Sequence, residues 1–213
     1  MLIRWRLAIV VLCFFQFTSL SAQNRAPEDN ASLILIVGDS LSAEYGIQRG
    51  TGWVARLRDR LLKQGSAYQI QNASISGDTT SGGLSRLPAL LDRYQPDIVI
   101  IELGSNDALR GLSLKMTEAN LSKMVVMVQE VGARPLLLGM QIPPNYGRRY
   151  AEEFKQLYVS VAKAHKVELL PFFLEGIATD PAMFQADRMH PNENAQATLE
   201  GNVWSRLETM LHP

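Results

Sequence analysis

The chain has 213 residues, of which 46% are hydrophobic, so it is long enough and apolar enough to bury one full core. It carries 21 basic and 21 acidic residues without runs of one sign, which excludes electrostatic capture of nucleic acid as its function. We therefore expect a single globular domain whose substrate need not be charged.

Residues 1–22 differ in composition from the remainder of the chain. Arg4 and Arg6 precede an almost uncharged apolar run over residues 7–17, and small residues follow at positions 19, 21 and 22. This pattern is typical of a secretory signal peptide, cleaved after Ala22 or after Ser21. The run is shorter than the roughly 18 to 20 apolar residues that cross a bilayer, which disfavours a stable membrane anchor. We expect an exported mature domain over residues 23–213, periplasmic in a Gram-negative bacterium and secreted otherwise.

The single cysteine of the chain, Cys13, lies inside this apolar run. Bulky Leu12 precedes it where a lipidation site requires a small residue, so attachment of a lipid is disfavoured. The mature chain then has neither a disulfide nor a thiolate nucleophile, and its fold must depend on core packing alone.

Short β-rich apolar runs alternate with longer stretches of helical spacing. The predicted strands are residues 33–37, 68–70 with Asn72 following, 98–103, 135–140 and 167–170. The predicted helices are residues 53–62, 84–94, 114–131, 148–165 and 194–211. Right-handed crossovers place helices on both faces of a parallel sheet. The alternation therefore predicts a three-layer α/β fold, a flavodoxin-like five-stranded parallel sheet with helices on both faces.

Loops rich in polar and glycine residues follow the first three predicted strands. In an open parallel sheet, ligands bind outside the carboxyl ends of the strands, near the point where the strand order reverses. The loops there hold residues 38–42, 72–78 and 104–107, and residues 187–191 precede the last helix. We expect these four segments to converge on one rim.

Ser40, Asp187 and His190 on this rim provide the groups that nucleophilic catalysis needs. A serine hydroxyl requires a neighbouring base to remove its proton, and the base requires a carboxylate that orients it. The other two histidines are poorer candidates for the base. His165 ends a predicted helix, where a cation complements the helix dipole, and His212 lies in the C-terminal tail.

Candidate donors to an oxyanion are the backbone amides of Ser40 and Gly77 and the side-chain amide of Asn106. Each position also has a purely structural interpretation. Serine and asparagine commonly cap turns and helices, and glycine satisfies a positive φ. For Gly104 we adopt the structural interpretation of a positive φ in a tight turn, and for Asp107 that of an Asx turn or a helix N-cap.

The four segments resemble the sequence blocks of the SGNH hydrolases, the GDSL family, and occur in the same order. Residues 38–41 match the GDSL block, Gly77 the glycine of the second block, residues 104–107 the GxND block, and Asp187 with His190 the DxxH block. The resemblance covers essentially the whole mature chain. Residues 72–83, 102–112 and 145–150 are further similar to the bacterial thioesterase I, protease I and lysophospholipase L1 group. The chain departs from that group at Ser105, where glycine is usual.

The resemblance implies a serine hydrolase that forms an acyl-enzyme on Ser40. It implies His190 as general base and then acid, Asp187 as the carboxylate that orients it, and an oxyanion hole of Ser40, Gly77 and Asn106. The implied substrates are acyl esters, aryl esters, acyl thioesters and lysophospholipids, and no cofactor is implied. The sequence has no HExxH motif or paired histidine spacing, so no metal is expected. The absence of a long heptad seam makes a monomer the simplest expectation.

Apolar residues after the third and fourth predicted strands are candidates for lining an acyl groove: Leu109, Leu112, Ile142, Pro143 and Tyr146. Core packing is an equally weighted interpretation of these positions. Two other functions also remain open. The same triad would serve a carbohydrate O-acetyl esterase, and a non-catalytic flavodoxin-like binding protein would use the same rim, although the sequence contains neither GxGxxG nor a phosphate-binding loop.

Overall fold

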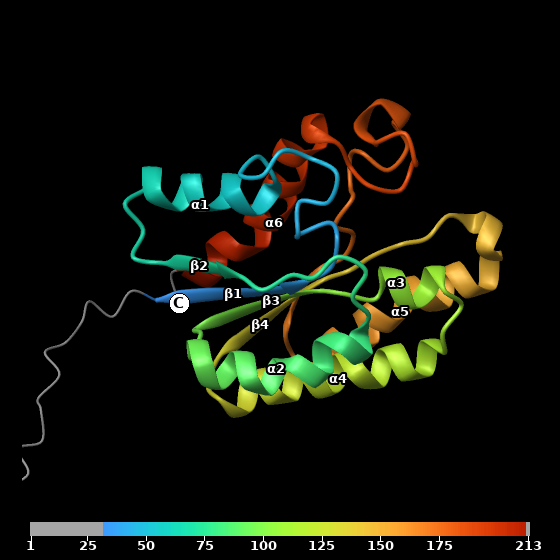
Figure 1. Cartoon of the computed structure of the whole chain (residues 1–213). Coiled ribbons are helices and arrows are strands. Elements are labelled where there is room, and N and C mark those ends of the chain that lie inside the picture. The colour runs from blue at the N-terminus through green and yellow to red at the C-terminus, as the bar shows by residue number, and fades with distance from the viewer. Residues whose placement is uncertain (1–31, 212–213) are drawn as a thin grey trace, which may run out of the picture. The chain divides into compact units, whose positions relative to one another are not determined.

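The computed structural model describes residues 32–211, and the expectations for the signal peptide, Cys13 and His212 lie outside this range. The described residues belong to one compact unit. Strands and helices alternate along it in the predicted order (Figure 1). Among the described helices, none is long and apolar enough to cross a membrane.

The sheet has five parallel strands: β1 (Leu33–Gly38), β2 (Gln69–Asn72), β3 (Ile98–Glu102), β4 (Arg134–Leu138) and β5 (Glu168–Leu170). Their spatial order is β2-β1-β3-β4-β5, so the strand order reverses between β1 and β3. This order confirms the predicted flavodoxin-like sheet. It also places the expected ligand site at the carboxyl ends of β1 and β3, where Gly38 lies opposite Glu102.

Helices cover both faces of the sheet, as the alternation predicts. Helices α1 (Trp53–Lys63) and α6 (Gln196–Leu211) lie on one face (Figure 1). Helices α2 (Thr80–Tyr94), α4 (Leu114–Glu130) and α5 (Arg148–His165) lie on the other. Helix α1 packs on α6, α2 packs on α4, and α4 packs on α5. The result is the three-layer arrangement expected from the sequence.

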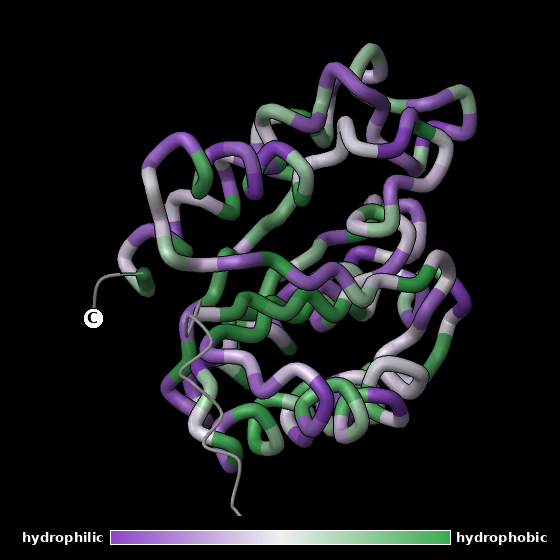
Figure 2. Tube along the Cα trace, turned by 60° about the vertical axis from the view of Figure 1, so that its left-hand side comes forward, coloured by the Kyte–Doolittle hydropathy of each residue, from purple (hydrophilic) through white to green (hydrophobic). Residues whose placement is uncertain are grey.

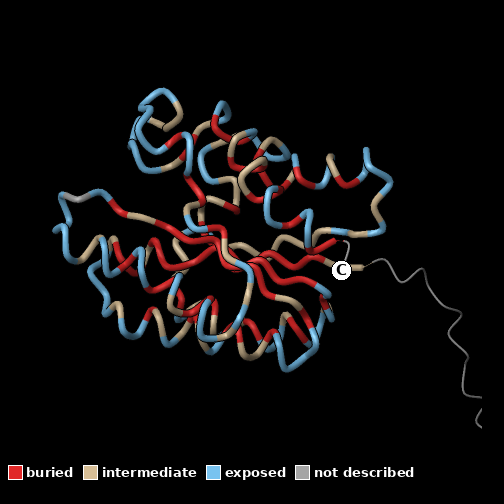
Figure 3. The backbone as a smooth tube through the Cα atoms, turned by 180° about the vertical axis from the view of Figure 1, so that it is seen from behind, coloured by how far each residue is buried: buried red, intermediate tan, exposed pale blue. Residues whose placement is uncertain are grey.

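The core lies in the central strands, which are buried on both faces. Figure 2 shows the hydrophobic residues concentrated in the sheet, and Figure 3 shows that the central strands are buried while the outer faces of the helices are exposed. Ile34, Ile36 and Ile100 have no exposed surface. The Trp53 ring packs edge-to-face on Phe173 between α1 and the end of the sheet, with ring centroids 5.5 Å apart. This contact joins α1 to the segment that follows β5.

The structure differs from the sequence prediction in a few elements. Helix α2 begins at Thr80, four residues before the predicted start, because the Thr79 side chain caps it by accepting the Gly82 amide. Helix α3 (Ser105–Leu109) was not predicted, since five residues are too few to show a helical period. Three single-turn 3₁₀ helices complete the described chain: η1 (Pro144–Tyr146), η2 (Pro181–Met183) and η3 (Glu193–Ala195).

Candidate active site

Ser40 lies in the turn directly after β1, and three strand ends hold this turn. The Glu102 carboxyl at the end of β3 accepts hydrogen bonds through Oε2 from the Asp39 amide (3.2 Å) and the Ser42 hydroxyl (2.7 Å). From the end of β2, the Asn72 side-chain amide donates to the Ser42 carbonyl oxygen at 2.7 Å. The position of the serine is thus set by β1, β2 and β3 together.

His190 faces Ser40 from the loop before η3, with 3.1 Å between its Nε2 and the serine Oγ. On the other side of the ring, Nδ1 lies 2.6 Å from Asp187 Oδ2. Asp187 Oδ1 accepts the backbone amides of Met189 (2.9 Å) and His190 (3.0 Å). The three-residue offset brings carboxylate and ring together because Arg188 adopts a left-handed φ of +55°. The structure therefore joins the three predicted triad residues in one line.

The charge state of Asp187 suits an acceptor for the imidazole. Burial by itself raises the pKa of this carboxyl, but the hydrogen bonds from His190 and Met189 outweigh it and lower the pKa to about 2. The Tyr45 ring covers the imidazole, with centroids 4.5 Å apart and planes inclined by 42°. Asp187 is thus ionised at neutral pH and fixes Nδ1 as the protonated ring nitrogen, which leaves Nε2 as the base toward Ser40.

Gln185 joins the histidine loop to the serine loop. Its side-chain Nε2 donates to the carbonyl oxygens of Tyr45 (2.9 Å) and Pro191 (3.2 Å). Its backbone amide donates to the His190 carbonyl oxygen at 2.8 Å. Sequence reasoning missed Gln185, because no local pattern distinguishes it from an exposed loop glutamine.

Three donors are available at the predicted oxyanion positions. Among residues 32–211, the backbone amides of Ser40 and Gly77 donate to no other group. Gly77 has a φ of +80°, a backbone conformation that is strained for any residue with a side chain. Asn106, in the first turn of α3, donates through Nδ2 to Asp39 Oδ2 at 2.9 Å. Since a side-chain amide carries two hydrogens on this nitrogen, one remains for a ligand.

Arg86 of α2 braces the loops after β1 and β2, a role that the sequence did not indicate. Its Nε pairs with Asp78 Oδ2 at 2.8 Å. Its Nη1 donates to the Ala73 carbonyl oxygen, and its Nη2 donates to the Gly38 carbonyl oxygen at 3.3 Å. The side chains of Arg86 and Asp78 are only 19% and 11% exposed. This partly buried pair thus ties the nucleophile turn to the Gly77 loop.

The GxND block contributes to packing as well as to the rim. Gly104 has a φ of +120°, and a Cβ there would overlap the Tyr158 hydroxyl, which supports the structural interpretation of this glycine. Asp107 is buried and accepts hydrogen bonds from the Thr80 amide (2.9 Å), the Thr80 hydroxyl and the Thr117 hydroxyl (3.2 Å). The prediction that Asp107 serves only as an Asx turn or an N-cap is therefore wrong, because it ties α3 to α2 and α4.

The structure separates the five residues predicted to line an acyl groove. Leu112 and Tyr146 are each 44% exposed, and Pro143 is exposed beside Tyr146. Leu109 is half-buried and packs against the core. Ile142 is 8% exposed and belongs to the core itself. The expectation for Ile142 is corrected accordingly, since a core side chain has almost no surface left for a substrate.

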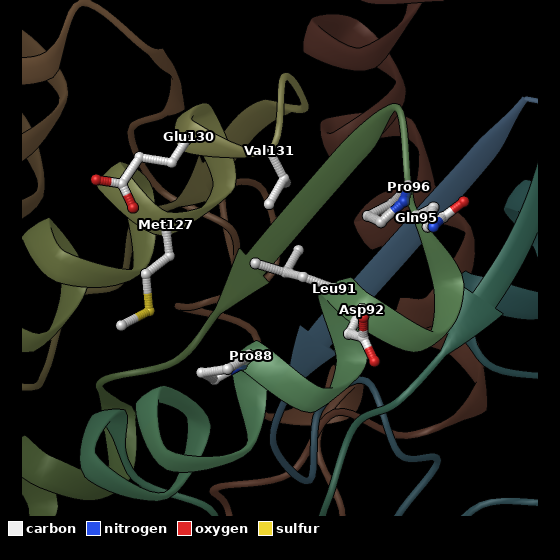
Figure 4. Close-up of a pocket in the computed structure, with 8 residues that line it drawn as sticks. All are labelled: Pro88, Leu91, Asp92, Gln95, Pro96, Met127, Glu130 and Val131. Atoms are coloured by element: carbon white, nitrogen blue, oxygen red, sulfur yellow. The ribbon is translucent and has the colours of Figure 1, made fainter.

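The hollow beside Ser40 is much smaller than a second hollow, which lies at the far end of the sheet. The hollow beside Ser40 and His190 has a volume of only about 10 Å³. A groove of about 620 Å³ lies between the C-terminal ends of α2 and α4 (Figure 4). It is lined by Pro88, Leu91, Asp92, Gln95, Pro96, Met127, Glu130 and Val131. The C-terminal end of α2 leads into the start of β3, so the groove lies at the amino ends of the strands. The triad lies at their carboxyl ends. The candidate active site is therefore beside the smaller hollow.

Comparison with known proteins places the chain in a family. Residues 36–197 match the model of the GDSL-like Lipase/Acylhydrolase family. Esterase TesA of Pseudomonas aeruginosa is 50% identical over 181 residues, which cover 85% of this chain and 90% of that protein. Thioesterase 1/protease 1/lysophospholipase L1 of Escherichia coli (strain K12) is 40% identical over 209 residues, which cover 98% of this chain and 95% of that protein.

A solved structure agrees with this match. The psychrotrophic esterase EstA from Pseudoalteromonas sp., in a crystal structure inhibited by monoethylphosphonate, superimposes with a TM-score of 0.82 at 40% sequence identity. The alignment covers 85% of this chain and 100% of that one. The family model, the relatives and the fold all agree with the resemblance seen in the four sequence blocks. The chain belongs to the GDSL-like lipase/acylhydrolase family.

Proposed function

We propose that this chain is a serine hydrolase that cleaves acyl esters and thioesters through an acyl-enzyme on Ser40. The observation that carries the proposal is the line of contacts from Ser40 Oγ to His190 Nε2 (3.1 Å) and from His190 Nδ1 to Asp187 Oδ2 (2.6 Å). The names of the relatives, an esterase and a thioesterase/lysophospholipase, support ester and thioester carbonyls as the reacting groups.

In the acylation half-reaction, Ser40 Oγ forms a bond to the carbonyl carbon while His190 Nε2 takes the hydroxyl proton. The carbonyl π electrons move onto its oxygen, which receives hydrogen bonds from the Ser40 and Gly77 amides and from Asn106 Nδ2. The tetrahedral intermediate then collapses and its C–O or C–S bond breaks. His190 returns the proton to the leaving alcohol or thiol.

Deacylation repeats these steps with water as the nucleophile. His190 Nε2 takes a proton from water, whose oxygen bonds to the acyl carbon. Collapse breaks the bond to Ser40 Oγ, and the proton passes back to the serine. Asp187 stabilises the imidazolium in both halves and keeps the ring in the productive tautomer.

Exposed apolar side chains that follow the carboxyl ends of β3 and β4 support a substrate with an extended acyl chain. Leu112, Pro143 and Tyr146 offer exposed apolar surface in the segments that follow β3 and β4. We assign medium and long acyl esters, acyl thioesters and lysophospholipids as the substrate class. We also assign residues 1–22 as a cleaved export signal, on the charge and hydropathy pattern of that segment.

The test is a hydrolysis assay of residues 23–213 on p-nitrophenyl esters and acyl-CoA from C2 to C16. We expect turnover of medium and long chains, abolished by Ser40→Ala and lowered roughly 10²- to 10³-fold by Asn106→Ala. Ser205→Ala, at an exposed position on α6, is the matched control and should leave the rate unchanged. Near-wild-type turnover in Ser40→Ala would refute the proposal, and activity confined to acetyl esters would reassign the chain as an O-acetyl esterase.

A further inference from the structure

Two buried carboxyl groups lie beneath the nucleophile turn and have no part in the reaction described above. Asp39 immediately precedes Ser40 and is 1% exposed, and Glu102 at the end of β3 has no exposed surface. The parallel register sets Gly38 opposite Glu102, so the glutamate lies directly under the start of the turn. Burying two acids in one place costs free energy, which calls for a functional reason.

The hydrogen bonds of the two carboxyl groups are unequal. Both oxygens of Asp39 are satisfied, with Oδ1 accepting the Leu41 amide (3.0 Å) and Oδ2 accepting Asn106 Nδ2 (2.9 Å). Glu102 Oε2 accepts hydrogen bonds from the Asp39 backbone amide and the Ser42 hydroxyl. Its Oε1 is buried without a hydrogen-bond partner among the described residues. An unpartnered buried oxygen costs much more free energy on a charged carboxylate than on a neutral carboxyl group. The negative charge therefore belongs on Asp39 and the proton on Glu102.

The electrostatics agree with this assignment. Burial raises the pKa of Glu102 well above its usual value, and the charge of Asp39 raises it further. Burial also raises the pKa of Asp39, to about 6, while the bonds from Leu41 and Asn106 and the nearby His190 act in the opposite direction. Two neighbouring buried carboxyl groups titrate as a pair and retain one proton over a wide pH range.

The partner of Asp39 is the side chain that donates to the oxyanion in the proposed mechanism. An amide nitrogen carries two hydrogens in one plane, so fixing one hydrogen fixes the direction of the other. The Asp39 carboxylate also selects the amide orientation, because the flipped side chain would present Oδ1 of Asn106 to the carboxylate. The flipped orientation would be repelled there.

We propose that Asp39 is a positioning residue for the oxyanion hole, acting through Asn106, and that protonated Glu102 holds Asp39 in place. One hydrogen of Asn106 Nδ2 stays on Asp39 Oδ2, and the second is directed toward the developing oxyanion. The inference rests on the proposed hydrolase function and adds to it a residue that touches neither the substrate nor the reacting atoms.

The first variant is Asp39→Asn, which keeps the shape of the side chain. It replaces one acceptor oxygen by an amide NH₂ donor. That donor then points at the backbone amide hydrogen of Leu41 or at the side-chain amide hydrogen of Asn106. We expect kcat for p-nitrophenyl ester hydrolysis to fall about 10- to 100-fold, less than the full loss of an oxyanion donor. KM should stay within about two-fold, because the affected bond forms to the oxyanion and not to the bound ester.

A double-mutant cycle with Asn106→Ala tests the path of the effect. If Asp39 acts through Asn106, Asp39→Asn should lower kcat by no more than about two-fold in the Asn106→Ala background. Losses that multiply in the double variant would overturn the proposal, because they would mean that Asp39 acts independently of Asn106.

Active sites are counted by titration with a fluorophosphonate, and folding is followed by thermal unfolding. The matched control is Glu200→Gln, a buried acid 2.9 Å from Arg60 on the α1/α6 face of the sheet, which should lower stability and leave kcat per titrated site unchanged. If Asp39→Asn keeps the wild-type kcat per titrated site, the positioning role of Asp39 is overturned but the hydrolase function is not. A wild-type chain that neither hydrolyses esters nor reacts with the fluorophosphonate would overturn the hydrolase function and this inference with it.

Discussion

Arg86 Nη2 donates to the carbonyl oxygen of Gly38 at 3.3 Å, two residues before the nucleophile. The same guanidinium binds Asp78 and the Ala73 carbonyl oxygen in the loop after β2. One helix side chain therefore spans the two loops that provide the Ser40 and Gly77 amides. Its contribution can be measured separately from that of the triad.

Replacing Arg86 by methionine should lower both stability and turnover. The Asp78 carboxylate, 11% exposed, would lose its partner, and two carbonyl oxygens would lose donors. Losing hydrogen bonds to charged groups of this kind costs on the order of 2 to 3 kcal/mol in the free energy of unfolding. We expect kcat to fall as well, since the two loops are no longer tied together.

Arg93→Met provides the control on the same helix. Arg93 is exposed and stacks over the Tyr94 ring, away from the rim. Its replacement should change the free energy of unfolding by less than about 0.5 kcal/mol. Urea titration of both variants makes the comparison, and equal effects would contradict the bracing role of Arg86.

Asp187→Asn should reduce kcat by roughly 10³- to 10⁴-fold with little change in stability. The asparagine still accepts the Met189 and His190 amides, but it no longer fixes the Nδ1–H tautomer of the ring. Asp180→Asn is the matched control, because Asp180 caps η2 through the Ala182 amide and asparagine caps equally well. A single-turnover assay that shows acylation at the wild-type rate in Asp187→Asn would contradict the assigned role.

Glu102→Gln should alter how stability depends on pH. The pKa of Glu102 is raised by burial, so the folded chain keeps this proton at pH values where the unfolded chain has lost it. The group thus contributes fully below its ordinary value of 4.5, and the contribution is lost as pH rises through the folded pKa. Relative to wild type, Glu102→Gln should therefore become progressively more stable from pH 5 to pH 9.

Thermal unfolding at pH 5, 7 and 9 makes this comparison. The other ionisable groups around Glu102 and its partner Asp39 are Arg86, His190, Asp107 and Tyr158. The Tyr158 pKa is raised well above its usual value by burial, so this hydroxyl stays protonated over the range. A Tm difference between Glu102→Gln and wild type that does not vary with pH would show that Glu102 keeps no raised pKa.

Leu112→Ala and Tyr146→Ala should weaken activity on long acyl chains more than on short ones. Losing contact with one or two methylene groups, at about 0.8 kcal/mol each, corresponds to roughly four- to fifteenfold in kcat/KM. We expect that loss for the C12 ester and almost none for the C2 ester. Leu62→Ala is the control, since Leu62 is 70% exposed on α1. An unchanged chain-length profile in both Leu112→Ala and Tyr146→Ala would argue against an acyl surface at these residues.

The sheet and the long helices were predictable because their signals are local. The apolar runs at residues 33–37 and 98–103 lie in strands buried on both faces, where every side chain meets the core. Ser40, Asp187 and His190 could be identified because each stands in a short motif at a strand end or before a helix. Helix α3 and the early start of α2 were not predicted, because α3 is too short and the first turn of α2 contains Gly82 and Gly83.

The groups that support the site could not be predicted, because their roles depend on partners far away in the sequence. Glu102 acts on Ser42 across 60 residues, Arg86 on Gly38 across 48, and Gln185 on Tyr45 across 140. Ile142 shows the opposite problem. An apolar residue after a strand has the same pattern whether it faces a groove or the core, and only the structure shows that it faces the core.

Ser40 and His190 are 150 residues apart, one after the first strand and the other just before the last helix. A chain that is still being synthesised therefore carries its nucleophile without a base. The hydroxyl gains its reactivity only when α6 has packed on α1 and the final loop has reached the rim. Catalysis thus reports complete folding, and a partly folded chain lacks an assembled triad.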